Sequence, residues 1–143
     1  DKWSVTIAAR RVEQAKEFAT SYPNNRLRIT SFSDLQPSTP RQAQDSAYDL
    51  VVNTTPLGMS PNLNQSALPE NLSLPQHVAI YDLVYNPSVT KLVRDARLQG
   101  LQATTGLGML IEQAALSFEI WTGCNPPRKA ISASVEQSPV SNL

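Results

Sequence analysis

Short apolar runs rich in β-branched residues alternate along the chain with segments whose apolar residues recur every three or four positions. The runs are typical of buried strands, and the three-to-four spacing is typical of amphipathic helices. Strands are predicted over residues 3–8, 26–30, 50–52, 77–84 and 101–104, and helices over residues 11–22, between Asn86 and Gly100, and over residues 106–121. Because strand and helix alternate, we expect an α/β fold with a parallel sheet and right-handed crossovers.

Capping residues indicate where the predicted helices begin and end. Asn86-Pro87 is typical of a helix start, and Gly100 stands where a left-handed C-cap is expected. Thr39-Pro40 indicates a further short helix in the weakly patterned segment 31–47. The chain has no periodicity after Gly123, and we interpret residues 124–143 as a mobile tail.

The helix over residues 106–121 has the strongest pattern, and its apolar residues are predicted to share one face. That face carries Leu107, Leu110, Ile111, Ala114, Phe118 and Trp121.

Parallel α/β sheets bind ligands at the carboxyl ends of their strands. The residues that follow Ala8, Val52, Val84 and Thr104 are therefore the first candidates for a site. Residues 55–75 contain four of the 11 prolines, and we interpret them as a long irregular loop at this edge.

Composition narrows the class of protein. The chain has 143 residues, of which 41% are hydrophobic, enough for one core of ordinary size. Its 12 basic and 12 acidic residues give no net charge, which argues against a nucleic-acid partner. The single cysteine, Cys124, excludes an internal disulfide and a Cys-based zinc site, and no metal cluster or Ser–His–Asp set is evident. No apolar run approaches the roughly 20 residues that span a bilayer, so we expect a soluble, cytoplasmic domain.

Two consecutive arginines follow the first predicted strand. Arg10 and Arg11 stand where the second strand of a Rossmann-type sheet ends, and guanidinium groups bind a ribose 2′-phosphate bidentately. NAD-binding proteins usually place Asp or Glu at this point, and no acidic residue follows the strand before Glu13. The alternative is that both arginines are solvated residues at a helix start, and spacing alone does not decide between the two interpretations.

Polar residues also follow the later strands. Asn53, Thr54 and Thr55 offer donors and acceptors to a ligand, and Gly58 permits close approach of its backbone. The alternative is a Pro-Gly turn in which Met59 fills the core.

Three more side chains are candidates for polar contacts. Tyr85 is able to offer its phenol to a ligand or to cover the core with its tip in water. Asp82 suits acid–base chemistry or a structural role beside a helix start, and Gln113 lies off the apolar stripe, facing either a hydroxylated ligand or solvent.

These segments together resemble the NADP-binding domain of shikimate dehydrogenase. DLVVNTTPLGM (49–59) is similar to the family's strand followed by N-[AT]-T-[SP]-x-G-M. YDLVYNPSVTKL (81–92) is similar to its D-x-V-Y-x-P-x-x-T-x-L-L stretch, and GLGMLIEQAALSFEIWTG (106–123) to its G-L-G-M-L-x-x-Q-A-x-x-x-F-x-x-W-T-G helix. The resemblance covers roughly residues 3–123.

The resemblance implies a Rossmann-like, doubly wound parallel sheet and NADP as the cofactor. It implies hydride transfer between NADPH and the ring ketone of 3-dehydroshikimate, which gives shikimate in the chorismate route to aromatic amino acids. Carried over by position, it implies that Arg10 and Arg11 hold the 2′-phosphate, that Thr54 and Thr55 line the cofactor groove, that Leu83 and Gly106 flank the nicotinamide, and that Tyr85 and Gln113 touch shikimate.

The chain departs from the family pattern at two places. The phosphate signature N-R-T-x-x-[RK] reads Ala9-Arg10-Arg11-Val12-Glu13-Gln14, so Arg11 is the one compensating charge and the preference for NADP is softened. Thr105 occupies a position that is often Asp in the family.

The chain is also expected to be a fragment. It starts on Asp1, runs directly into a strand-like segment and has its first glycine at Gly58, whereas the family has a strand and a G-x-G-G turn upstream. We therefore predict a partial Rossmann domain over residues 1–123, incomplete at its N-terminal edge, and a tail over 124–143. The strands over 3–8 and 49–52 would then lack their shared central partner, so we expect low stability and pairing with other chains.

The family's catalytic Lys and Asp belong to its amino-terminal domain, so no catalytic residue is predicted here and the chain is expected to be inactive alone. A quinate/shikimate dehydrogenase relative, a non-catalytic α/β binding module and a truncated pseudoenzyme are the alternatives. Partners are expected to be small molecules, and the state a monomer or homodimer.

Overall fold

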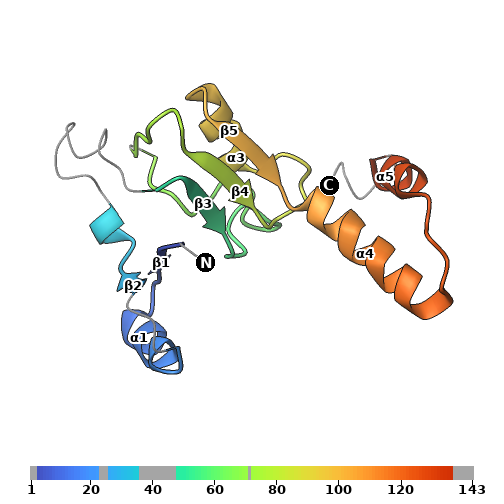
Figure 1. The fold of residues 1–143 in the computed structure, drawn as a ribbon. Helices are drawn as coiled ribbons and strands as arrows, with labels where there is room; N and C mark the ends of the chain where they lie inside the picture. The colour runs from blue at the N-terminus through green and yellow to red at the C-terminus, as the bar shows by residue number, and fades with distance from the viewer. Residues whose placement is uncertain (1–2, 23–25, 36–47, 71, 137–143) are drawn as a thin grey trace. The chain divides into compact units, whose positions relative to one another are not determined.

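The computed structural model describes residues 3–22, 26–35, 48–70 and 72–136, which fall into two compact units, Asp1–Ser46 and Ala47–Leu143 (Figure 1). Strands and helices alternate along both units, and every strand pairing is parallel, which confirms the predicted α/β class. The short helix predicted at Thr39-Pro40 lies outside the described residues.

The first unit is one strand–helix–strand repeat. Its elements are β1 (Val5–Ala8), α1 (Val12–Thr20), β2 (Leu27–Thr30) and a 3-10 turn, η1 (Ser33–Leu35). β1 pairs with β2 in parallel, with Val5 opposite Leu27. None of the described residues of this unit is buried, so the described part of it has no core of its own.

The second unit is built on a three-stranded parallel sheet. Its order is β3 (Leu50–Asn53), β4 (Ala79–Asp82) and β5 (Gln102–Thr105), and the three strands run side by side in Figure 1. In the described residues this sheet has no strand pairing with the β1–β2 pair, as expected where the strands over 3–8 and 49–52 lack a shared central partner.

Helix α3 (Lys91–Leu98) covers one face of this sheet and forms the core with it. The cluster consists of Val78, Ile80, Leu92, Ala96 and Leu101, each no more than 5% exposed. Burial of a side chain of this size stabilises a fold by about 1.5–3 kcal/mol, so this cluster is the main source of stability in the unit.

Helix α3 begins four residues later than the Asn86-Pro87 pair predicts. Its N-cap is Thr90, whose Oγ1 accepts a hydrogen bond from the Val93 amide at 3.3 Å. The cap forms there because the Thr90 hydroxyl also donates to a buried carboxylate, Asp82, at 2.6 Å. Gly100 follows the helix with φ +82°, which confirms the predicted left-handed residue.

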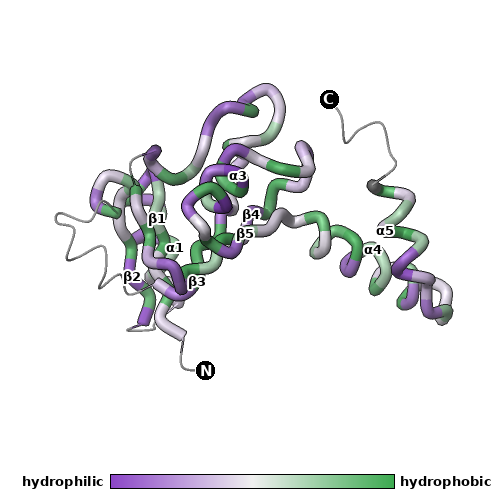
Figure 2. The backbone as a smooth tube through the Cα atoms, turned by 90° about the horizontal axis from the view of Figure 1, so that it is seen from above, coloured by the Kyte–Doolittle hydropathy of each residue, from purple (hydrophilic) through white to green (hydrophobic). Residues whose placement is uncertain are grey.

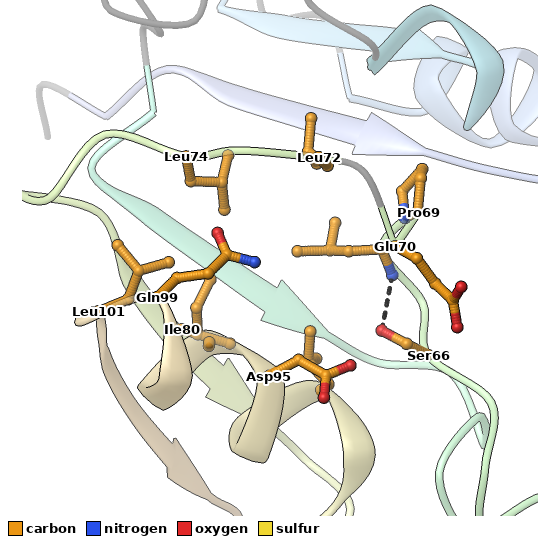
Figure 3. Close-up of a pocket in the computed structure, with 12 residues that line it drawn as sticks. Ser66, Pro69, Glu70, Leu72, Leu74, Ile80, Asp95, Gln99 and Leu101 are labelled. Carbon is orange, nitrogen blue, oxygen red and sulfur yellow. Dashed lines mark hydrogen bonds between the residues drawn. The ribbon is translucent and has the colours of Figure 1, made fainter.

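The loop after β3 folds back over α3 and the end of the sheet (Figure 3). Ser66, Leu72 and Leu74 from the loop, together with Ile80 and Asp95, surround a cavity of about 30 Å³. That volume admits one or two water molecules and no organic ligand, so the cavity is a packing feature.

Lys91 ties this loop to α3. Its ammonium donates to Asp95 one turn along the helix and lies 3.3 Å from Glu70 in the loop. The hydrogen bond with Asp95 raises the pKa of Lys91 above its usual 10.5, against the smaller opposing effect of desolvation.

Helices α4 (Leu107–Thr122) and α5 (Arg128–Glu136) end the described chain. Hydrophobic stretches recur along α4 in Figure 2, yet only Ile111 and Ala115 are buried, and Trp121 is 81% exposed. The predicted helix is confirmed, and its apolar face is only partly covered in the described residues, because α5 is the one described element with several contacts to α4.

Helix α5 occupies part of the segment that was interpreted as an unstructured tail. It begins after Pro126-Pro127 and is held to α4 by Arg128, which donates to Glu112 at 3.0 Å. The boundary at residue 123 between domain and tail stays a prediction.

The two edges of the three-stranded sheet differ. Arg97 donates from Nε and Nη2 to the outward-facing carbonyl of Ala103, at 3.0 and 2.9 Å, and so covers the edge of β5. On β3 the carbonyls of Asp49 and Asn53 bond to β4, so by alternation the backbone groups of Leu50 and Val52 face outward. They have no partner among the described residues.

The unpaired edge of β3 is predicted to drive association between copies of the chain. We expect Val52→Pro to reduce concentration-dependent association, measured by sedimentation velocity, because proline blocks the outer edge without removing a bond to β4. Val51→Pro is the matched control and is expected to unfold the unit, since its amide faces β4. Equal association of Val52→Pro and the unmodified chain would contradict this prediction.

The ion pairs of Lys91 predict that the stability of the folded chain falls at alkaline pH. Because the folded pKa of Lys91 lies above the unfolded value, its contribution is complete below about pH 10.5 and is lost as pH rises through the folded pKa. The melting temperature of the unmodified chain is therefore expected to converge on that of Lys91→Met in alkaline buffer. A constant difference between the two chains from pH 8 to pH 12 would contradict this assignment.

Candidate functional site

The carboxyl ends of β3, β4 and β5 lie side by side at one end of the sheet. We call this end the carboxyl edge, as distinct from the outer strands β3 and β5. Asn53 stands opposite Asp82, and Asp82 stands opposite Thr105, so the segments that follow all three strands leave from the same edge (Figure 1). This arrangement confirms that the polar segments after these strands are neighbours.

In the segment after β3, Thr54 and Thr55 play different parts. The Thr54 side chain is exposed. The Thr55 hydroxyl donates to Asn53 Oδ1 at 2.7 Å and accepts from the Leu57 amide at 3.3 Å. Thr54 is therefore the residue whose hydroxyl is open to a ligand, whereas Thr55 shapes the turn.

Gly58 closes the same turn in a left-handed conformation. Its φ is +92°, and an added Cβ would stand 3.3 Å from the Thr90 side chain. The turn therefore packs directly on the start of α3.

The segment after β4 begins on a buried carboxylate and ends on an exposed phenol. Asp82 is fully buried, Leu83 is half-buried, and Tyr85 is 45% exposed. Tyr85 thus presents its ring to solvent at the carboxyl edge, as a ligand contact requires.

Gly106 lies between β5 and α4 and contacts this segment. Its amide donates to the Val84 carbonyl at 3.3 Å, and an added Cβ would lie 2.4 Å from the Leu83 carbonyl oxygen. Real Cβ atoms do not approach this closely, so Gly106 lets the backbones of β5 and the Leu83 segment touch. The family resemblance pairs Leu83 with Gly106, and the structure brings them into contact.

Gln113 lies on α4, two turns beyond Gly106, with its side chain exposed. At 1.5 Å per residue it stands about 10 Å along the helix from the sheet edge. The side-chain amide of Gln113 makes no hydrogen bond among the described residues, so it is open to a ligand.

Arg10 and Arg11 follow β1 in the first unit. Both side chains are exposed, and Arg11 makes one long contact, 3.4 Å to Gln14 Oε1. Neither guanidinium forms an ion pair within the described part of the chain, so this donor set fits a phosphate group. Because they belong to the other unit, a site shared with Thr54, Leu83 and Gly106 stays a prediction.

Sequence reasoning missed the hydrogen-bond network of Asp82. Asn53 and Asp82 both stand at carboxyl ends of neighbouring strands, and Thr90 is three residues before Val93, the spacing of an N-cap bond. The polar residues at two neighbouring strand ends and the N-cap spacing of Thr90 were the signals from which a buried cluster of Asn53, Asp82 and Thr90 could have been predicted.

The described residues hold no group of three His, Cys, Asp or Glu side chains able to bind a metal ion. Among the helices that the structure describes, none has the length and apolar character needed to cross a membrane.

The comparisons with known proteins agree on one family. The family model for the "Shikimate 5'-dehydrogenase C-terminal domain" matches residues 106–136. A shikimate dehydrogenase (NADP(+)) of Alkaliphilus oremlandii is 38% identical over 122 residues, covering 82% of this chain and 41% of that protein.

Solved structures give the same result. Shikimate 5-dehydrogenase of Thermus thermophilus, in complex with NADP(H) and shikimate, aligns with a TM-score of 0.73 and 30% identity, over 95% of this chain and 46% of that one. The enzyme of Listeria monocytogenes, in complex with shikimate and NAD, aligns with a TM-score of 0.72 and 27% identity, over 91% of this chain and 46% of that one.

Parallel strands, crossover helices and these structural neighbours define a Rossmann-like α/β fold. The chain belongs to the shikimate dehydrogenase family. It spans less than half the length of the curated relatives it matches, 46% of the one from Methanococcus vannielii, for example.

Gly106 provides a test of the site's geometry. Gly106→Ala is expected to displace the Leu83 segment from β5, because the new methyl group has no room beside the Leu83 carbonyl. The expected result is a lower melting temperature and a changed environment of Tyr85, measured by thermal denaturation and by the NMR spectrum of its ring.

Gly108→Ala is the matched control, since a Cβ at Gly108 meets nothing within 4 Å. It is expected to leave Tyr85 unchanged and to stabilise α4 by up to about 1 kcal/mol through helix propensity. The same response from both variants would contradict the close approach at Gly106.

Proposed function

We propose that this chain is the dinucleotide-binding part of an NADP-dependent shikimate dehydrogenase, which reduces 3-dehydroshikimate to shikimate. The observation that carries the proposal is the level edge of β3, β4 and β5, where exposed Thr54, Tyr85 and the glycine contact at Gly106 come together. Family membership supplies the class of cofactor and substrate for this edge.

The residues present fit NADP in their donor chemistry. Arg10 and Arg11 would hold the 2′-phosphate, Thr54 would bind along the groove with Thr55 shaping it, and Leu83 and Gly106 would flank the nicotinamide. The bound cofactor would supply the hydride, whereas this chain's own residues bind and orient it.

Tyr85 and Gln113 would orient the substrate. A phenol and a primary amide both donate to and accept from hydroxyl groups, which suits a polyhydroxylated ring. Both side chains are exposed. The family resemblance places the catalytic Lys and Asp in the amino-terminal domain, so the catalytic groups are predicted to lie outside residues 1–143. Oxidation of shikimate by the chain alone would contradict that prediction.

A partial dinucleotide domain over residues 1–123, a cytoplasmic location and a monomeric or dimeric state also remain predictions.

The choice of cofactor tests the arginine assignment. We expect the chain to bind NADPH more tightly than NADH, measured by titration of the cofactor's fluorescence. Arg10→Ala is expected to weaken NADPH binding roughly tenfold to a hundredfold, because a charge-assisted hydrogen bond contributes about 1.5–3 kcal/mol, and to leave NADH binding unchanged.

Arg28→Ala, at an exposed arginine on β2 of the same unit, is the matched control and is expected to change neither affinity. Equal affinity of the unmodified chain for both cofactors would remove the 2′-phosphate assignment.

A further inference from the structure

Asp82 is a fully buried carboxylate at the centre of the carboxyl edge, and the proposed function gives it no part. Its Oδ1 accepts from Asn53 Nδ2 at 2.8 Å and from the Val84 amide at 3.1 Å. Its Oδ2 accepts from the Thr90 hydroxyl at 2.6 Å. No ion pair of Asp82 exists within the described residues, so these three donors alone compensate its burial.

The partners of Asp82 fix the direction of every bond. Thr90 Oγ1 already accepts from the Val93 amide, so its own hydrogen points to Asp82. Asn53 Oδ1 already accepts from the Thr55 amide and hydroxyl, at 2.9 and 2.7 Å, so its amide nitrogen faces Asp82. Asp82 is therefore the acceptor of the whole network, and no neutral side chain of the same shape can accept all three bonds.

The network ties together three segments that leave the same edge. Through Asn53 and Thr55 it reaches the turn that presents Thr54, and through Val84 it holds the segment between Leu83 and Tyr85. Through Thr90 it fixes the start of α3, on which Gly58 packs.

We propose that Asp82 is a positioning residue of the dinucleotide site, which holds the Thr54 turn and the Leu83–Tyr85 segment in their binding arrangement before a ligand arrives. This inference rests on the proposed function for the identity of the ligand. Its geometric content, the rigid preformed edge, is measurable without nucleotide.

The first test is amide hydrogen exchange of the full chain without nucleotide. Thr90→Val keeps the shape of the side chain and removes the hydroxyl, so the amides of Thr55, Leu57 and Val84 are expected to exchange at least tenfold faster. The Leu101 amide, which bonds to Ala96 at the far end of α3, is the internal reference and is expected to change less. Thr90→Ser keeps the hydroxyl and is expected to restore slow exchange.

A charge-specific test uses the Asn53–Asp82 contact. Asn53→Asp would place two carboxylates at hydrogen-bond distance, which raises the pKa of the pair, so the variant is expected to regain stability as pH falls from 8 to 5. Adding Asp82→Asn restores one donor and one acceptor, and is expected to remove that pH dependence and to slow exchange at Thr55. Exchange of the Val84 amide is expected to stay fast, because the side-chain NH2 of the new asparagine at position 82 faces the Val84 N–H and cannot accept from it.

The functional test is NADPH affinity, measured well below each variant's melting temperature. Thr90→Val is expected to weaken NADPH binding at least tenfold, and Thr90→Ser less than twofold. Unchanged exchange at Thr55 and Val84 in Thr90→Val, or unchanged NADPH affinity despite faster exchange, overturns the positioning role. Failure of the unmodified chain to bind NADPH overturns the proposed function instead, and the exchange and pH results still decide whether Asp82 holds the edge.

Discussion

The in-register pairing of β3, β4 and β5 is the constraint on which the second unit depends. It places Asn53, Asp82 and Thr105 at one level, so the chain must turn after each strand within a small area. Three turns in a small area bring many backbone polar groups together away from water, and these groups require partners. The buried carboxylate of Asp82 accepts from one of them, the Val84 amide, and from the side chains of Asn53 and Thr90, so it connects the three segments that turn there.

The same constraint explains the glycine at the end of β5. The Leu83 segment, held down by Asp82 through Val84, occupies the space that a side chain at position 106 requires. Stability and binding geometry are therefore linked. The hydrogen bonds of Asp82 that hold the start of α3 also determine the positions of the exposed side chains of Thr54 and Tyr85.

Much of this arrangement was predictable from the sequence. Alternating strand and helix patterns located β1 to β5 to within a few residues and gave the parallel α/β class, since each strand carries its own apolar signal. Ordered motifs identified the family.

The predicted start of α3 was wrong. Asn86-Pro87 is a good helix start in isolation, but the hydrogen bond between Thr90 and Asp82, which accompanies the observed N-cap, is a tertiary contact that the local sequence does not show. The exposure of much of the apolar face of α4 was not predictable, because periodicity shows which residues share a face and not whether another element covers it. Roles of single residues in binding stay predictions, since spacing places a side chain at an edge without showing what it contacts.

Arg97 has a consequence for any larger assembly that contains this sheet. Its guanidinium occupies the Ala103 carbonyl, an acceptor on the outer side of β5, so a strand that paired with β5 would have to displace this side chain. At the other side of the sheet, the outward backbone groups of Leu50 and Val52 have no such competitor among the described residues. A partner strand engineered to lengthen this sheet is therefore better designed to pair with β3, with its donors and acceptors matched to the spacing of Leu50 and Val52.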